Sequence, residues 1–191
     1  IEAPNAGSKI EYYECKARFL VNSAGLQATE LANRIEPRPQ NIPAQYFCKG
    51  SYFDYTGASP FSHLVYPMPE QDQTGLGIHA TLNLAGQVRF GPDAEYVDAI
   101  DYQVDENKRL AFAQAIRQYF PTLETNRLIP AYSGVRPKLV GAGENPGDFL
   151  IQDEATHGTR NLIQLFGIES PGLTASLALA EVIAQMIKSR F

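Results

Sequence analysis

Residues 167–174, which read Gly-Ile-Glu-Ser-Pro-Gly-Leu-Thr, combine types that could hold an electron-rich group at the start of a helix. Ser170 is a favoured N-cap residue, and Pro171 would then occupy the first helical position, where its missing N–H costs nothing. A helix N-terminus carries about half a positive charge and presents unpaired N–H groups, which suit an anion or an electron-rich oxygen. Gly172 in the first turn would let such a group approach closely. The alternative is an ordinary capped helix whose glycine lets a strand pass nearby.

A second candidate is the imidazole of His79, in a segment that alternates apolar and polar residues over 75–84. This alternation predicts a strand with one face in a core and the other, which carries His79, facing a ligand or solvent. An imidazole with an ordinary pKa near ~6.5 can act as a general base at neutral pH. A solvated surface histidine is the alternative. Residues 75–80 match the letters of a dinucleotide-binding motif, but we expect more strand rather than a helix after them, so we reject that interpretation.

The third candidate is Arg136 in the run Ser-Gly-Val-Arg-Pro-Lys over residues 133–138. A residue before proline is restricted to an extended conformation, which fixes the direction of its side chain. A guanidinium held in this way suits the bidentate binding of a carboxylate. An arginine in a surface loop is the alternative.

The composition narrows the class of protein. The chain has 191 residues, 44% of them hydrophobic, which is enough for one large or two small globular domains. Its net charge is −5 and it has no cluster of Lys and Arg, so we expect no nucleic-acid partner. Two cysteines without metal spacing or a disulfide pattern favour a reducing compartment and no metal site. The apolar helix over 173–187 contains Glu181 and Gln185, so we expect it in a core and not across a membrane. Because the first residue is Ile1 and the opening resembles the middle of a sheet, we expect a piece of a longer protein.

The elements that would position these residues are strands and short helices. A strand over 18–21 is followed by small residues at 22–25 and a helix over 26–35, and prolines at 37, 39 and 43 suggest a domain crossing. Strands over 45–55, 63–68, 75–84 and 87–90 predict an antiparallel meander. A helix over 106–120, capped by Asp105, would bury one face, and two more strands are expected over 129–140 and 162–166. The buried face of that helix is expected to consist of Leu110, Ala113, Ile116 and Phe120.

Several runs, taken together and in this order, resemble the FAD-dependent oxidoreductases of the D-amino-acid-oxidase superfamily, and most of all its L-2-hydroxyglutarate dehydrogenase group. The runs lie at residues 22–25 (Asn-Ser-Ala-Gly), 49–50 (Lys-Gly), 63–67 (His-Leu-Val-Tyr-Pro), 77–81 (Gly-Ile-His-Ala-Thr), 91–92 (Gly-Pro), 133–138 and 167–174. One departure is that the group's Lys-Gly-Glu-Tyr run is Lys-Gly-Ser-Tyr at residues 49–52 here.

The resemblance implies an α/β fold whose substrate part is α+β, in the C-terminal portion of a two-domain flavoprotein. Residues 1–41 and 131–191 would belong to the FAD-binding domain, and residues 42–130 would form the substrate-binding domain with an antiparallel or mixed sheet. The glycine-rich turn that holds the FAD pyrophosphate in this family has no counterpart in the sequence. We therefore expect this piece to bind FAD weakly or not at all by itself.

The resemblance also implies roles for individual residues. The cofactor-binding set would be Ala24, Gly25, Gly134, Arg136, Gly167, Glu169, Ser170, Pro171, Gly172, Leu173 and Thr174. Arg136 would bind the substrate carboxylate, with Tyr66 and Lys49 as its expected neighbours. His79 would take the hydroxyl proton of the substrate, and His63 and His157 are weaker candidates, the latter expected at the surface.

The implied activity is the oxidation of a small 2-hydroxy acid, such as L-2-hydroxyglutarate, to the 2-oxo acid by hydride transfer to the flavin. An FAD-dependent amino-acid or amine oxidase and a non-catalytic piece that cannot hold FAD are the alternatives. We expect a small carboxylate substrate and a cytoplasmic location, and peripheral membrane association stays open. Oxygen, a quinone or another protein could accept the electrons.

Overall fold

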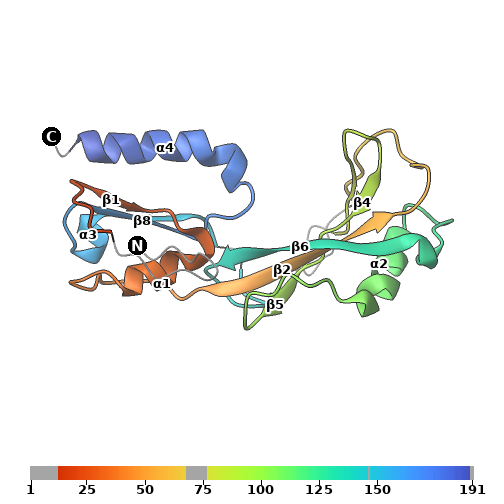
Figure 1. The fold of residues 1–191 in the computed structure, drawn as a ribbon, viewed down its shortest axis with the longest axis horizontal. Coiled ribbons are helices and arrows are strands. Elements are labelled where there is room, and N and C mark those ends of the chain that lie inside the picture. The colour runs from red at the N-terminus through yellow and green to blue at the C-terminus, as the bar shows by residue number, and fades with distance from the viewer. Residues whose placement is uncertain (1–12, 68–76, 146, 190–191) are drawn as a thin grey trace.

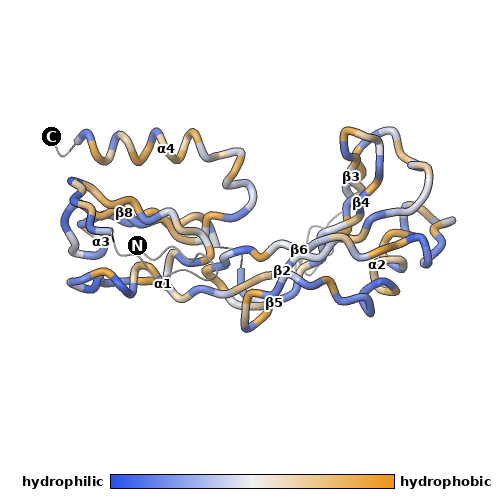
Figure 2. The backbone as a smooth tube through the Cα atoms, viewed as in Figure 1, coloured by the Kyte–Doolittle hydropathy of each residue, from blue (hydrophilic) through white to orange (hydrophobic). Residues whose placement is uncertain are grey.

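The computed structural model describes residues 13–67, 77–145 and 147–189. Its strands form a three-stranded small sheet, in the order β1–β8–β7, and a five-stranded large sheet made of β2 to β6. Figure 1 shows an elongated molecule in which β2 and β6 run side by side between the two ends. Figure 2 shows apolar residues gathered at those ends, on the small sheet and around α2. The arrangement confirms the expected mixed α/β class.

The large sheet is built around two long antiparallel strands, β2 (Tyr46–Tyr55) and β6 (Leu128–Lys138). The other edge of β2 pairs with β5 (Glu95–Val97) near its start and with β4 (Val88–Phe90) near its end. The short strand β3 (Ala80–Leu82) pairs with β4. The strands expected over 45–55, 87–90 and 129–140 are confirmed, whereas β5 was not predicted from the sequence.

Two expected strands of the meander differ from the structure. The prediction of a strand over 63–68 is wrong, because Val65 forms only an isolated bridge with Ala80. Residue 68 lies outside the described residues. Of the strand over 75–84, residues 75 and 76 also lie outside the described residues, and the ladder covers only 80–82. It ends there because Asn83 Oδ1 accepts hydrogen bonds from the N–H groups of Ala85 and Gln87 and closes a turn. Leu84, which was expected in the core, is therefore fully exposed.

The two long strands change register once, and this change defines two faces of the large sheet. Ser51 pairs with Ser133, but Phe53 pairs with Pro130, so β6 has one extra residue between these pairs. Before the shift, alternate residues of the two strands share one side, which we call the open face. It consists of Cys48, Gly50 and Tyr52 from β2 and Tyr132, Gly134 and Arg136 from β6. The opposite side, which we call the covered face, carries Lys49, Ser51 and Phe53.

A hydrophobic core lies on the covered face, between the sheet and α2 (Arg109–Ile116). The ring of Phe112 packs against that of Phe53 with a centroid separation of 4.6 Å. As predicted, Asp105 caps the preceding turn (η2, Glu106–Lys108) by accepting a hydrogen bond from Asn107 N–H. The expected buried face is wrong in one residue: Leu110 is exposed, because the stripe that meets the sheet contains Phe112 in its place.

The small sheet consists of β1 (Leu20–Asn22), β8 (Leu162–Phe166) and β7 (Leu150–Gln152), with β1 parallel and β7 antiparallel to β8. A turn η1 (Gly25–Gln27) and α1 (Ala28–Asn33) follow β1, while α3 (Glu154–His157) lies between β7 and β8. The long helix α4 (Gly172–Lys188) ends the described chain. Phe166 packs against α1, whereas Ile163 packs with Ile183 of α4, so the two helices cover opposite faces of the sheet (Figure 1).

The expected domain boundary at residue 131 falls inside β6, which continues in the large sheet to Lys138. The chain therefore passes from the large to the small sheet after β6, and the division into domains stays a prediction. Among the helices of the described residues, none is both long and apolar enough to cross a bilayer.

Candidate active site on the open face of the large sheet

Arg136 lies on the open face with its guanidinium above Gly50. Its register partner is Cys48, whose Sγ lies 3.9 Å from Arg136 Nη1. A Cβ atom at Gly50 would lie only 3.2 Å from Arg136 Nη2, so the glycine gives the guanidinium its room. None of the ion pairs among the described residues includes Arg136. A half-buried cation without a carboxylate partner is suited to bind an anion from outside the chain.

Two tyrosines stand beside Arg136 on the same face. The rings of Tyr52 and Tyr132 are stacked, with centroids 4.6 Å apart and planes at 15°. Arg89 lies over the ring of Tyr132, 4.6 Å from its centroid, and is held by Asp54 through hydrogen bonds of 2.6 and 3.0 Å. Burial raises the pKa of the Tyr52 phenol, the neighbouring Tyr132 adds to the rise, and Arg136 opposes it. Sequence reasoning missed this group, because its members come from three separate strands.

His79 lies on the same face of the sheet. It precedes Thr81 by two residues, and Thr81 pairs with Arg89, which lies over Tyr132. The imidazole meets the ring of Tyr66 edge to face, with centroids 4.4 Å apart. His79 is half-buried, while Tyr66 is largely exposed, so this pair lies at an edge that a ligand can reach.

His79 and Arg136 share a face but are not neighbours. With about 4.8 Å per strand and about 3.4 Å per residue, three strands and four residues put their Cα atoms roughly 20 Å apart. The Arg136 guanidinium shortens that separation, because it lies over Gly50 and not over Cys48, its register partner. A substrate that meets both groups must therefore lie across the middle of the open face.

Lys49 was expected to be a neighbour of Arg136, but the structure separates the two side chains. It pairs with Val135 in β6, so its side chain projects to the covered face. There its ammonium group is almost fully buried and donates hydrogen bonds to Asp101 at 2.7 Å and to the carbonyl of Gln103. The alternation of a strand separates residues 49 and 136, although their strands are adjacent. Lys49 therefore has a structural role in this fold.

The start of α4 is open, but not in the way the sequence predicted. Ser170 does not cap the helix: the N-cap residue is Pro171, and no side chain caps the first turn. The Gly172 N–H group bonds instead to the carbonyl of Glu169, which leaves Ser170 in solvent. In the part of the chain that the structure describes, the N–H groups of Leu173 and Thr174 have no acceptor. The helix tip therefore offers the free donors that the anion-binding interpretation requires.

Gly172 itself has a reason within the chain. A Cβ atom there would lie 2.8 Å from Cγ2 of Ile168, so the close approach that a glycine permits is to the preceding loop. Gly167 has a positive φ of 65°, and a Cβ there would collide with Leu139 at 2.7 Å. These two glycines shape the loop, and residues 168–174 line a pocket of about 380 Å³ at the tip.

An ion pair ties this loop to the open face. Glu169 Oε1 and Lys138 Nζ form an ion pair at 2.5 Å, and both side chains are mostly buried. Lys138 lies two residues after Arg136 on β6 and shares its face. The pair therefore places the helix tip beside the end of β6 that carries Arg136. Glu169, which was expected to bind the cofactor, is engaged in holding the loop.

Ala24, Gly25 and Gly134 also come to this region, because η1 lies against β6. Gly25 has a positive φ of 57°, and a Cβ atom at Gly25 or Gly134 would have nothing within 4 Å. The Ala24 N–H group bonds to Asn22 Oδ1 at 3.3 Å, which fixes the turn from β1 into η1. Two glycines with open space beside them and a free helix tip fit a flat, electron-rich cofactor such as a flavin.

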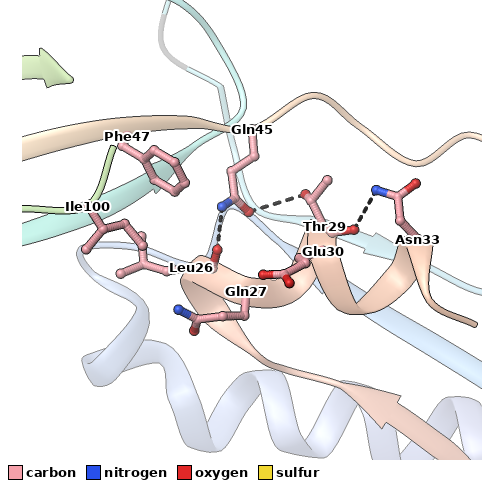
Figure 3. Close-up of a pocket in the computed structure, with 8 residues that line it drawn as sticks. All are labelled: Leu26, Gln27, Thr29, Glu30, Asn33, Gln45, Phe47 and Ile100. Atoms are coloured by element: carbon pink, nitrogen blue, oxygen red, sulfur yellow. Dashed lines mark hydrogen bonds between the residues drawn. The ribbon is translucent and has the colours of Figure 1, made fainter. Parts of the chain in front are cut away.

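A second pocket, of about 310 Å³, lies between α1 and the start of β2 (Figure 3). Its polar side chains bond mostly to one another: Gln45 donates to the Leu26 carbonyl at 2.6 Å and accepts from Thr29 at 3.2 Å. None of the expected site residues lines it. This pocket is therefore a weaker candidate than the open face.

The remaining histidines do not join the site. His63 is exposed and bonds to Ser62 at 2.9 Å. His157 was expected at the surface, but it is buried at the end of α3, where its Nδ1 accepts a hydrogen bond from Thr159 N–H. This contact supports a structural role for His157.

Comparisons with known proteins identify the family of this chain. A family model described as FAD dependent oxidoreductase matches residues 2–186. A protein of Arabidopsis thaliana named mitochondrial L-2-hydroxyglutarate dehydrogenase is 47% identical over 179 residues, which cover 87% of this chain and 37% of the relative. A glycerol 3-phosphate dehydrogenase of Caloramator mitchellensis is 25% identical over 175 residues, with 90% and 34% covered. The chain thus spans about a third of the length of these two relatives.

A solved structure shares the fold. It is the FAD-bound, dithionite-reduced L-alpha-glycerophosphate oxidase from Mycoplasma pneumoniae, with a TM-score of 0.66 and 21% identity over 84% of this chain and 40% of that one. A cytoplasmic location stays a prediction, since the plant relative is named as mitochondrial. The resemblance noted in the sequence is confirmed: the chain belongs to the family of FAD-dependent oxidoreductases, whose cofactor is FAD.

Proposed function

We propose that the protein containing this chain oxidises a small 2-hydroxy acid, such as L-2-hydroxyglutarate, to the corresponding 2-oxo acid. The observation that carries the proposal is Arg136, a half-buried cation on the open face without a carboxylate partner among the described residues. The relative named L-2-hydroxyglutarate dehydrogenase supports the choice of substrate.

In this proposal Arg136 binds one carboxylate of the substrate through its planar fork, which orients the rest of the molecule across the open face towards His79. His79 takes the proton of the substrate hydroxyl, as a general base held edge-on against Tyr66. When bound, FAD supplies the acceptor for the hydride that leaves the substrate carbon. The electron acceptor that restores FAD stays open between oxygen, a quinone and a protein.

The residues that would hold FAD lie at the end of β6 and the start of α4. Gly134 and Gly25 leave room beside a flat ring, and Ala24 lies next to them. The free N–H groups of Leu173 and Thr174 would stabilise negative charge on the reduced ring. The approach of FAD to these N–H groups would be shaped by four other residues of the same loop: Gly167, Ser170, Pro171 and Gly172.

The carboxylate role is tested by steady-state kinetics of the full-length protein with L-2-hydroxyglutarate. Arg136→Met removes charge-assisted hydrogen bonds of about 1.5–3 kcal/mol, so kcat/KM is expected to fall by about 10- to 150-fold. Arg136→Lys keeps the charge without the fork, so its kcat/KM is expected to lie between those of the wild type and Arg136→Met. Arg160→Met, at a side chain that is 88% exposed, is the matched control. Equal kinetics for the Arg136 and Arg160 variants would refute the role of Arg136.

The base role is tested with His79→Ala on two substrates, L-2-hydroxyglutarate and L-glutamate. Loss of a general base is expected to lower kcat for the hydroxy acid by about 10²–10⁴-fold. Unchanged turnover would show that His79 is not the base. A wild-type protein that oxidises glutamate but not the hydroxy acid would support an amino-acid oxidase, and one that oxidises neither would support a non-catalytic role.

A further inference from the structure

The Arg136 guanidinium lies in a slot over three residues of β2, with Pro92 and the Asp93 carbonyl of the loop after β4 close by. Cys48, Gly50 and Tyr52 are successive residues of the open face. Arg136 Nη1 lies 3.9 Å from Cys48 Sγ, and Nη2 lies above Gly50. Tyr52 follows Gly50 on that face, and the guanidinium lies over Gly50. Tyr52 therefore stands at the side of the slot that points towards His79.

The Tyr52 ring has two close neighbours. Gly91 approaches so closely that a Cβ there would lie 2.7 Å from Tyr52 Cδ1. The ring of Tyr132 is stacked on Tyr52 with centroids 4.6 Å apart. The guanidinium of Arg89 in turn lies over the Tyr132 ring.

Arg89 is anchored in its turn. Asp54 holds it by two hydrogen bonds in a fork geometry, and this pair raises the pKa of Arg89 above its ordinary value. The chain of contacts Asp54–Arg89–Tyr132–Tyr52 thus ends at the slot of Arg136. The Arg89 charge is neutralised by Asp54, which leaves Arg136 as the cation of this group that can bind an anion.

We propose that the Tyr52–Tyr132 stack, held by the Asp54–Arg89 pair, is a positioning element that fixes the Arg136 guanidinium for the substrate carboxylate. This inference rests on the proposed function of Arg136. The stack contributes rigidity and not chemistry, because a stacked aromatic pair loses little freedom when a ligand binds. Weakening the stack lets the guanidinium adopt other rotamers, and carboxylate binding then costs more conformational entropy.

The experiment measures binding without turnover. Glutarate has the carboxylates of the proposed substrate but no hydroxyl group, and its dissociation constant is measured by calorimetry on the FAD-loaded full-length protein. Tyr132→Leu is expected to raise that constant by about two- to tenfold, the range of an aromatic pair. Tyr132→Phe keeps the stack and is expected to stay within about twofold of wild type. In turnover, Tyr132→Leu is expected to raise KM by the same factor with kcat nearly unchanged.

Two further variants keep the test decisive. Tyr102→Leu, at another exposed tyrosine, is the matched control and should bind glutarate as the wild type does. Arg89→Met removes the cation over Tyr132 without touching the stack, so it should weaken glutarate binding in the same direction by a smaller factor. If Tyr132→Leu does not fold, the glutarate affinity of Arg89→Met tests the proposal in its place.

The proposal is overturned if folded Tyr132→Leu or Arg89→Met binds glutarate as tightly as wild type. It is also overturned if Tyr132→Leu lowers kcat and leaves KM unchanged, since the stack would then act on the reacting atoms. Wild-type protein that binds glutarate but oxidises no 2-hydroxy acid would refute the proposed function alone.

Discussion

Gly50 and Gly134 are register partners on the open face, and together they test where the cofactor lies. A Cβ at Gly50 would lie 2.8 Å from Pro92 Cβ and 3.2 Å from Arg136 Nη2. A Cβ at Gly134 would have nothing within 4 Å. The same alanine substitution therefore meets crowding at one position and open space at the other.

The expected magnitudes follow from this difference. Gly50→Ala overpacks the sheet and should lower the free energy of unfolding by about 1–3 kcal/mol. Gly134→Ala gains strand stability in the cofactor-free protein, by up to about 1 kcal/mol, because glycine loses more entropy on folding. If a flavin ring lies against β6, however, the added methyl group meets it, and FAD binding should weaken by about 5- to 150-fold, from about 1–3 kcal/mol of overpacking.

The assay combines chemical unfolding of the cofactor-free full-length protein with FAD titration of the same protein, followed by flavin fluorescence. The expected result is a stable Gly134→Ala variant that binds FAD poorly. If this variant were as stable as wild type and bound FAD equally well, no flavin would lie beside Gly134, and the placement of the cofactor along β6 would be refuted.

Three further predictions concern the covered face. Lys49→Met removes a buried ammonium group and its two hydrogen bonds, so the free energy of unfolding should fall by about 1–3 kcal/mol. The KM for L-2-hydroxyglutarate should stay within about twofold of the wild-type value. A rise in KM without a loss of stability would show that Lys49 binds the substrate after all. The hydrogen bond from Lys49 lowers the pKa of the Asp101 carboxyl, so its stabilisation is present above the unfolded value near ~3.9 and is lost as pH falls through the lower folded value. Unfolding of wild type and Asp101→Asn from pH 7 to strongly acid pH should show the two stabilities converging, and a difference that persisted in acid would contradict this. Phe112→Ala should lower the free energy of unfolding in urea by about 3–5 kcal/mol, and Leu110→Ala by less than about 0.5 kcal/mol. Equal losses for the two variants would indicate that Leu110 is buried, as the sequence predicted.

The long elements could be predicted from the sequence, because their signals are local. The aromatic content of β2, the extended restriction before Pro137 in β6 and the cap Asp105 all act within a few residues. The short strands β5 and β7 were missed, since three residues are too few to show an alternation.

The site could be predicted only in part. Arg136, His79 and the loop before α4 were found from their own residue types, yet the sequence does not show on which face a side chain projects. Lys49 was therefore placed beside Arg136, although strand alternation separates them. Ser170 failed as a cap because a backbone bond from Gly172 to Glu169 closes the turn first. The contact of Arg89 with Tyr132 depends on the register of three strands, which only the fold provides.

The register shift in β6 allows one strand to supply residues to both the hydrophobic core and the open face. Residues 128 and 136 are eight apart, so a regular strand would project both to the same side. The extra residue reverses this parity, and Leu128 can be buried against α2 while Arg136 faces the opposite way. Closing the bulge without removing a residue would project both side chains to the same side, so either the arginine would be driven into the apolar interior or the leucine would be exposed to water. Deleting one residue between Pro130 and Ser133 would instead leave a regular strand with the two side chains on opposite sides. The geometry of anion recognition and the integrity of the hydrophobic interior thus depend on a single irregularity of the backbone.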